Sequence, residues 1–230
     1  MEKYSKNVCE LKYEFVKTYK GNSHTTEILP NMPTDSFLIN EKQLSLLHKF
    51  LDINPIYSTH ISQKISDIEY TISEGDLNNY WIDSIKHDAS YAPFYPTWML
   101  SAWGLALAAK NFGFEKIIDI GSGDGRIAYC GKVLGLDTLS IEIDENLVNL
   151  QENLSEKTDV KFNPICSDAT VFNFEDVVSK KAIFVIGGVP EIGEILANSV
   201  IKNVLDIPKL SNSSFVLTGS HSHREFSRDK

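Results

Sequence analysis

The chain has 230 residues, of which 42% are hydrophobic and 23% are charged, a composition typical of a folded globular domain rather than a disordered chain. Its formal net charge of −9 argues against a broad nucleic-acid-binding surface, which needs clustered lysine and arginine. The sequence contains no apolar run of about 18 residues and no apolar N-terminal signal region. We therefore expect a cytoplasmic protein with no nucleic-acid partner and no membrane association.

Residues 1–90 form the first of two expected regions, a polar accessory region that we predict to be partly helical, so that the fold has a mostly helical N-terminal extension. An amphipathic pattern over 43–51 predicts a short helix. Over 61–72, isoleucines spaced by four, three and four residues predict a second helix. Such stripes are usually packing faces, so no ligand site is assigned to this region.

Residues 91–230 form the second region, in which predicted helices and short apolar strands alternate. A helix over 97–111 opens it, with Thr97 as its N-cap and Gly113 as its stop. Strands are predicted at 116–120, 138–143, 160–165, 182–187 and 214–218, and helices at 124–134, 145–156, 171–179 and 191–205. This alternation predicts an α/β fold with a doubly wound parallel sheet and right-handed crossovers.

The first of these strands runs directly into a loop with glycine at alternate positions: Gly121, Gly123 and Gly125. Glycines allow a tight turn and a close approach to a ligand, and the following helix directs its N-terminal amides at the loop. A dinucleotide site would have its third glycine at position 126, where Arg126 stands. Asp119 would repel a pyrophosphate but suits the cationic end of a sulfonium cofactor. A strand-to-helix turn without a ligand would use the same glycines.

The block from Asp119 to Gly125 resembles motif I of the class I S-adenosylmethionine-dependent methyltransferases. The resemblance implies S-adenosylmethionine as the cofactor and a strand order of 3-2-1-4-5. It also implies a set of cofactor-binding loop residues: Asp119, Gly121, Ser122, Gly123 and Gly125. The family usually has two further strands after the fifth. Few residues follow Thr218, so we expect this domain to lack them.

Two further acids follow later strands of the predicted sheet. Glu142 ends the second strand, where an acid roughly 20 residues after the loop holds ribose hydroxyls in this architecture. Asp168 and Ala169 follow the third strand, and the family resemblance implies that the acid there accepts a hydrogen bond from the adenine amino group. Acids at the ends of three successive strands favour a cofactor site over separate solvated carboxylates.

The stretch 91–96, Tyr-Ala-Pro-Phe-Tyr-Pro, precedes the first helix of the second region. Together with the glycine loop it resembles the non-SET histone-lysine methyltransferases and the small archaeal protein-lysine methyltransferases. The resemblance implies that Tyr91 is a wall of the cofactor or acceptor site and a candidate catalytic residue. An aromatic side chain packed between prolines is the alternative. His221 and His223 have no matching third ligand, so no metal site is assigned.

The leading hypothesis is an S-adenosylmethionine-dependent methyltransferase with a protein acceptor, lysine being the candidate, while a small-molecule acceptor and the oligomeric state remain open. Polyamine synthases share Gly-Asp-Gly and Glu-Ile-Asp, so an aminopropyltransferase is the second hypothesis. These enzymes usually have an apolar residue at the position of Asp119 and an acid where Gly187 and Gly188 stand. The third hypothesis is a non-catalytic relative that binds the cofactor and acts as an interaction protein.

Overall fold

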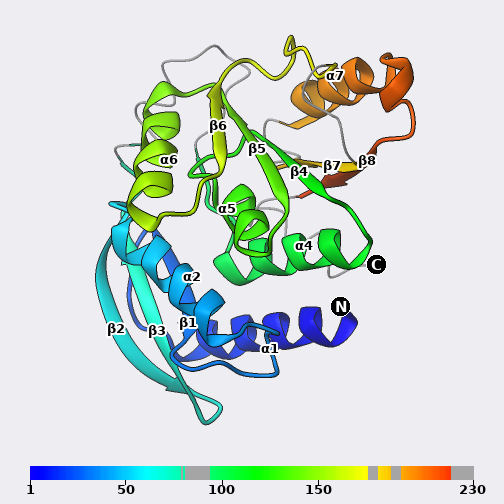
Figure 1. Cartoon of the computed structure of the whole chain (residues 1–230). Coiled ribbons are helices and arrows are strands. Elements are labelled where there is room, and N and C mark those ends of the chain that lie inside the picture. Colours follow the sequence, from blue (N-terminus) through cyan, green and yellow to red (C-terminus); the bar gives the residue numbers. More distant parts are fainter. Residues whose placement is uncertain (79, 81–93, 176–180, 188–192, 219–230) are drawn as a thin grey trace.

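The computed structural model describes residues 1–78, 80, 94–175, 181–187 and 193–218. In these residues the chain forms two sheets, a three-stranded antiparallel sheet near the N-terminus and a five-stranded parallel sheet with helices on both faces (Figure 1). None of the helices in this part of the chain has the length and apolar character needed to cross a bilayer.

The parallel sheet has the strand order β6-β5-β4-β7-β8. Its strands are β4 (Lys116–Ile120), β5 (Asp137–Glu142), β6 (Asn163–Cys166), β7 (Ala182–Ile186) and β8 (Ser214–Leu217). Counted in chain order within this sheet, the order is 3-2-1-4-5, as the family resemblance implied. The central strands β4 and β7 are almost fully buried, because helices cover both faces of a doubly wound sheet.

Helices cover the two faces of the parallel sheet unequally. One face packs on α4 (Met99–Asn111), α5 (Arg126–Val133) and α6 (Glu145–Thr158), and the other on α7 (Gly193–Leu205) and the short 3-10 helix η1 (Pro208–Leu210). Each face of the sheet has its own hydrophobic core. Ile117 of β4 packs in the core on the side of α4, α5 and α6, whereas Ile118 and Ile120 pack in the core on the side of α7. This alternation is expected for a strand whose successive side chains point to opposite faces.

The helix predicted over 171–179 is wrong in its described part, because 171–175 form no helix. Phe174 is buried beside Phe184 of β7, with ring centroids 5.5 Å apart. Asn173 accepts the backbone N–H of Glu175 at 2.9 Å. Such a local side-chain bond competes with helix formation. Residues 176–180 lie outside the described part of the chain.

Over residues 1–75 the N-terminal region forms α1 (Glu2–Thr18), β1 (Thr25–Pro30), α2 (Glu41–Ile53), β2 (Tyr57–Ile65) and β3 (Ile68–Gly75). The strands form the antiparallel order β1-β3-β2. Helix α2 confirms the helix predicted over 43–51. It begins at a capping box in which Asn40 accepts the N–H of Gln43 and the Gln43 side chain accepts the N–H of Asn40.

The helix predicted over 61–72 is wrong, because this stretch is the β2–β3 hairpin. Its isoleucines are cross-strand partners: Ile61 pairs with Ile72, and Ile65 pairs with Ile68. Their four-three-four spacing is symmetrical about the turn and coincides with the helical period. The turn residues Ser66 and Asp67 have φ of 47° and 70°, the positive values that tight hairpin turns require. The described part of the N-terminal region therefore contains a sheet as well as the helices α1 and α2.

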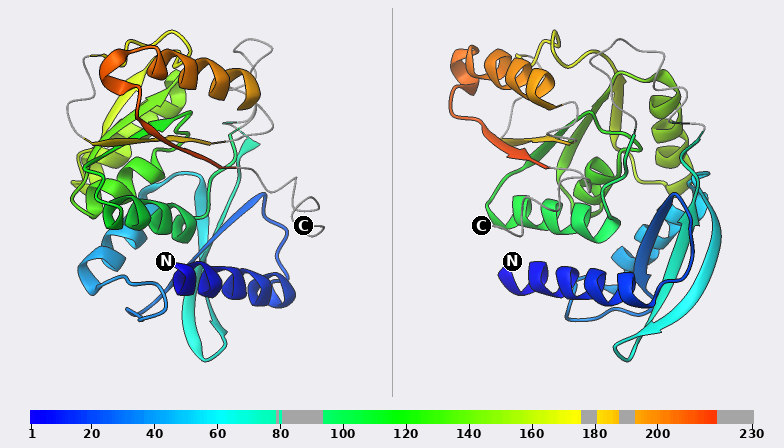
Figure 2. Two further views of the ribbon diagram at one scale, coloured as in Figure 1. Left: turned by 90° about the vertical axis from the view of Figure 1, so that its right-hand side faces the viewer. Right: turned by 180° about the vertical axis from the view of Figure 1, so that it is seen from behind.

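The N-terminal region and the parallel-sheet region share one hydrophobic core. Phe50 of α2 packs on Tyr129 of α5 with ring centroids 4.7 Å apart. Tyr4 of α1 donates a hydrogen bond to the carbonyl of Leu100 at 2.5 Å, and its ring lies against Gly104. Both views in Figure 2 show α1 running beside α4. The expected boundary between residues 90 and 91 lies outside the described residues.

Candidate functional site

The glycine loop joins the end of β4 to the start of α5. Gly121, Gly123 and Gly125 have φ of 62°, 59° and 77°, values that other residues rarely adopt. A Cβ on Gly123 would also clash with the ring of Phe94, so glycine at this position lets the segment before α4 lie directly on the loop. The loop is thus a tight turn between β4 and α5, with positive φ at all three glycines.

The carboxylate of Glu142, at the end of β5, lies against the glycine loop. Its Oε2 accepts the N–H of Gly123 at 2.8 Å, and its Oε1 accepts the N–H groups of Ile143 and Asp144 at 2.8 and 3.1 Å. Burial raises the pKa of Glu142 above its ordinary value, although these three N–H donors act in the opposite direction. Glu142 therefore fixes the loop to the end of the neighbouring strand.

Asp119 is buried just before the loop, with 1% of its surface exposed. Its Oδ2 accepts the N–H of Ala128 in the first turn of α5 at 3.3 Å. Burial raises the pKa of Asp119 well above its ordinary value, and the nearby carboxylates of Asp124 and Glu142 raise it further. Among the described residues, no cation forms an ion pair with Asp119 or Glu142.

Asp124, the third carboxylate of the loop region, has a different environment. The guanidinium of Arg126 donates to it twice, from Nε to Oδ1 at 2.9 Å and from Nη2 to Oδ2 at 2.6 Å. Asn54, the residue that follows α2, donates to Oδ2 at 3.0 Å. Asp124 is thus neutralised by the protein itself, and sequence reasoning gave it no role.

A buried amide supports the loop from α6. The Nε2 of Gln151 donates to the Oγ of Ser122 at 3.0 Å and to the carbonyl of Gly123 at 2.7 Å. Its Oε1 accepts the hydroxyl of Ser140 at 2.6 Å. Sequence analysis missed Gln151; the available signal was a glutamine within the buried stripe of a helix. Ser122, predicted to bind the cofactor, is held by this amide.

Asp168 and Ala169 follow β6 at the same edge of the sheet. Asp168 is exposed and accepts the N–H and the hydroxyl of Thr170 at 2.8 and 2.7 Å, whereas Ala169 is buried. The N–H of Ser167 donates to the carbonyl of Glu142 at 2.9 Å, which holds the two strand ends together. The structure therefore brings this segment next to Glu142.

Apolar side chains are exposed beside these acids. Ile143, directly after Glu142, is 38% exposed, and Val171, shortly after Asp168, is 78% exposed. Sequence analysis missed both, although an apolar residue directly after the strand-end acid was visible. Such side chains at a rim of carboxylates offer a surface for a flat apolar group such as a purine ring.

Some predicted residues fall elsewhere. Tyr91, Gly188, His221 and His223 lie outside the described residues. Thr97 is not the N-cap of α4, which begins after Trp98 and has no side-chain cap of its own. The carbonyl of Thr97 instead accepts a hydrogen bond from Nη1 of Arg126 at 2.6 Å.

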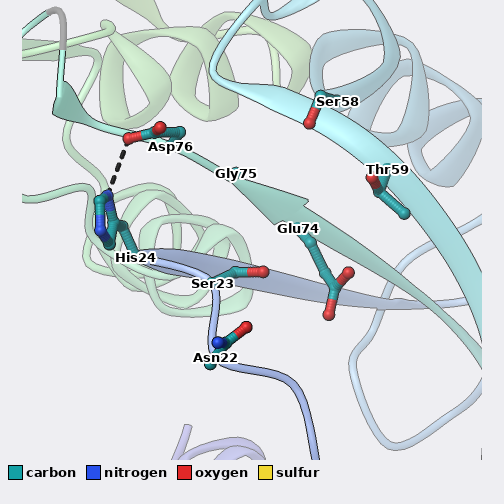
Figure 3. A pocket seen from close by; sticks show the side chains of 8 residues that line it. All are labelled: Asn22, Ser23, His24, Ser58, Thr59, Glu74, Gly75 and Asp76. Carbon is teal, nitrogen blue, oxygen red and sulfur yellow. Dashed lines mark hydrogen bonds and ion pairs between the residues drawn. The ribbon is translucent and has the colours of Figure 1, made fainter.

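A separate polar pocket of about 270 Å³ lies at the end of the antiparallel sheet (Figure 3). His24 and Asp76 face each other there, with Nδ1 and Oδ1 2.8 Å apart. The remaining lining comes from the strands and the chain before β1: Asn22, Ser23, Ser58, Thr59, Glu74 and Gly75. No residue predicted to bind a cofactor lines this pocket.

No protein-family model and no curated protein matches this sequence. Solved structures with a similar fold include the PH0226 protein of Pyrococcus horikoshii, at 14% identity and a TM-score of 0.44, covering 56% of this chain and 56% of that one. TehB of Haemophilus influenzae is 21% identical with a TM-score of 0.38, covering 62% of this chain and 46% of TehB. This chain thus spans about half the length of these two proteins.

The tRNA (uracil-54, C5)-methyltransferase of Pyrococcus abyssi, solved with S-adenosyl-L-homocysteine, is 16% identical with a TM-score of 0.43 and covers 70% of this chain and 35% of that one. At such identities and scores these similarities assign neither a substrate nor a reaction.

Proposed function

We propose that this protein binds S-adenosylmethionine at the glycine loop and transfers its methyl group to an acceptor. The observation that carries the proposal is a pair of buried carboxylates, Asp119 and Glu142, beside a glycine loop and without a described cation. S-adenosylmethionine brings a sulfonium, an ammonium group and two ribose hydroxyls. A ligand that is cationic and donates hydrogen bonds complements this environment, whereas a pyrophosphate would be repelled.

Glu142 has an acceptor position for a ribose hydroxyl. Its Oε1 accepts two N–H groups, but its Oε2 accepts only the N–H of Gly123 among the described residues. A carboxylate oxygen accepts two hydrogen bonds, so Oε2 retains one lone pair for a ligand. In the proposal, Asp168 accepts from the adenine amino group while Ile143 contacts the adenine ring.

When bound, the cofactor supplies an activated methyl group on a sulfonium that leaves as a neutral thioether, and the acceptor gives up a proton. The protein then has to align the acceptor and exclude water from the reacting centre. The fixed positions of the loop, of Glu142 and of the Phe94 segment serve the alignment. Buried surroundings also favour the neutral, nucleophilic form of an amine.

For the acceptor we retain a protein lysine, on the resemblance of 91–96 to the lysine methyltransferases and on the net charge of −9, which attracts basic proteins. In this proposal Tyr91 forms a wall of the acceptor channel. An aminopropyltransferase is less well supported, because Asp119 is present and Gly187 rather than an acid follows β7.

Calorimetric titration with S-adenosylmethionine, S-adenosylhomocysteine and NAD tests the cofactor proposal. We expect dissociation constants in the micromolar range for the first two and no binding of NAD. Transfer of a radiolabelled methyl group into cell-extract proteins, with lysine identified by mass spectrometry, then tests the acceptor. Tight NAD binding with no response to S-adenosylhomocysteine would overturn the cofactor proposal, and labelling of small molecules alone would overturn the lysine proposal.

A further inference from the structure

A carboxylate of the N-terminal sheet reaches the glycine loop through buried contacts. Glu27 of β1 is 1% exposed. One of its oxygens, Oε1, forms an ion pair with Nη1 of Arg126, the first residue of α5. The other, Oε2, accepts the N–H of Met99, the first residue of α4, at 2.7 Å. One side chain from β1 thus contacts the starts of two helices that border the loop.

Arg126 connects Glu27 to the glycine loop. Its guanidinium donates to Asp124 from Nε and Nη2 and forms an ion pair with Glu27 through Nη1. It also donates from Nη2 to the hydroxyl of Tyr57 at 2.8 Å. A guanidinium is planar and presents its donors in a fixed fork, so partners on several sides fix its position and orientation. Because Asp124 lies within the loop, its position depends on that of Arg126.

Glu27 also fixes the segment that lies on the loop. Helix α4 has no side-chain cap of its own, and Glu27 supplies the acceptor for its first N–H from a residue 72 positions away. Just before this helix, the ring of Phe94 contacts Gly123. The same carboxylate therefore controls both the loop and the segment packed against it.

We infer that Glu27 is a positioning residue for the cofactor site, which holds the glycine loop through Arg126 and the Phe94 segment through Met99. The inference rests on the proposed function, because it concerns the affinity of that site. It assigns the N-terminal sheet an indirect part in ligand binding, through the position of the glycine loop. If Glu27 served only as a stabilising link, its removal would lower stability and leave the affinity of the folded protein unchanged.

The variant Glu27→Gln tests this inference, since glutamine keeps the size of the side chain and removes its charge. We expect the dissociation constant for S-adenosylhomocysteine to rise at least tenfold, measured by calorimetry at a temperature where circular dichroism shows the variant to be folded. Glu69→Gln, an exposed position on the same sheet, is the matched control and should bind like the wild type. An unchanged dissociation constant for folded Glu27→Gln would overturn the inference.

Tyr57→Phe provides a second test if Glu27→Gln does not fold. It removes one neutral partner of Arg126 and should raise the same dissociation constant about threefold. An unchanged affinity would overturn the inference in this variant as well.

Hydrogen–deuterium exchange without ligand separates failure of this inference from failure of the proposed function. We expect faster exchange in Glu27→Gln at 121–126 and in the first turn of α4, but not in β6. Unchanged exchange at 121–126 would overturn the inference even if the wild type bound the cofactor. A wild type that bound neither S-adenosylmethionine nor S-adenosylhomocysteine would overturn the proposed function. The hydrogen–deuterium exchange at 121–126 would then decide the inference by itself.

Discussion

The buried carboxylates on the two sides of the glycine loop have different partners, a cation on one side and only backbone N–H groups of the described residues on the other. On one side, Asp124 and Glu27 share the guanidinium of Arg126, and Tyr57 and Asn54 complete their hydrogen bonds. On the other side, Asp119 and Glu142 receive only backbone N–H groups from the described residues.

This difference separates a structural role from a binding role. A buried ion pair is costly to break, so the side with Arg126 is suited to holding the loop in one position. Carboxylates without a cation remain unfavourably buried until a positively charged ligand arrives. Burial raises the pKa of Asp119, Glu142 and Glu27 alike, but only for Glu27 does a cation among the described residues, Arg126, act in the opposite direction. The comparison predicts that substitutions on the first side lower stability and change affinity only through the position of the loop, whereas those on the second side change affinity through contacts with the ligand itself.

The largest effect is expected from Arg126→Met. This change leaves Glu27 and Asp124 buried without their cation, and we expect the free energy of unfolding to fall by about 3–5 kcal/mol. Urea denaturation followed by circular dichroism measures it. Lys132→Met, a less buried change on the same helix, serves as the control and should cost well under half as much. Similar losses for both variants would contradict a structural role for the ion-pair network.

Glu142→Ala should lower the affinity of the protein for S-adenosylmethionine. Removing the acceptor for a ribose hydroxyl, together with the contact that holds Gly123, should weaken S-adenosylmethionine binding by about 2–3 kcal/mol. The nearby Asp144 accepts the N–H groups of Asn146 and Leu147 as the N-cap of α6. Asp144→Ala should therefore cost about 1 kcal/mol of stability and little affinity. Calorimetry on both variants measures the contrast, and equal losses of affinity would show that Glu142 has no special role.

Asp119→Asn removes the charge of the side chain and keeps its shape, so it tests what the charge contributes to stability and to binding. Because burial raises the pKa of Asp119 in the folded state, the folded protein binds this proton more tightly than the unfolded chain. The stability that this proton contributes is present below the ordinary pKa of an aspartate, about 3.9, and is lost as pH rises through the raised value. Binding of a cation requires the ionised form, so it should strengthen over the same rise in pH.

We therefore expect Asp119→Asn to stabilise the free protein at neutral pH and to weaken S-adenosylmethionine binding by about 1–2 kcal/mol. S-adenosylhomocysteine, which lacks the sulfonium charge, should be affected less. Melting temperatures from about pH 5 to pH 8, with and without each compound, test this expectation. Equal weakening of both compounds would exclude an interaction between Asp119 and the sulfonium charge.

Asp168→Ala should have the smallest effect, because this carboxylate is exposed and already accepts two hydrogen bonds from Thr170. We expect a loss of about 0.5–1.5 kcal/mol in cofactor affinity. Asp206→Ala, an exposed change after α7, is the control and should leave affinity unchanged. A loss as large as that for Glu142→Ala would mean that the adenine end rather than the ribose dominates binding.

Apart from the helix expected over 171–179, the sequence by itself determined the parallel-sheet region, because the signals there are local. A β-branched strand, a loop with glycine at 121, 123 and 125, and an acid at the end of the next strand each lie within one strand–turn–helix unit. The right-handed crossover rule then restricts the topology to few alternatives. The local signal failed at 61–72, where a spacing typical of a helix also fits a symmetrical hairpin.

Only the tertiary structure decided how the N-terminal region takes part in the site. Arg126 and Glu27 are 99 positions apart. In the sequence, Arg126 served only as evidence against a dinucleotide site, because it stands where such a site would have its third glycine. Nothing in the neighbourhood of either residue specifies its partner, because a charge in the sequence is compatible with solvent. Their burial depends on how β1 packs against α4 and α5, which is a property of the folded core rather than of any local pattern.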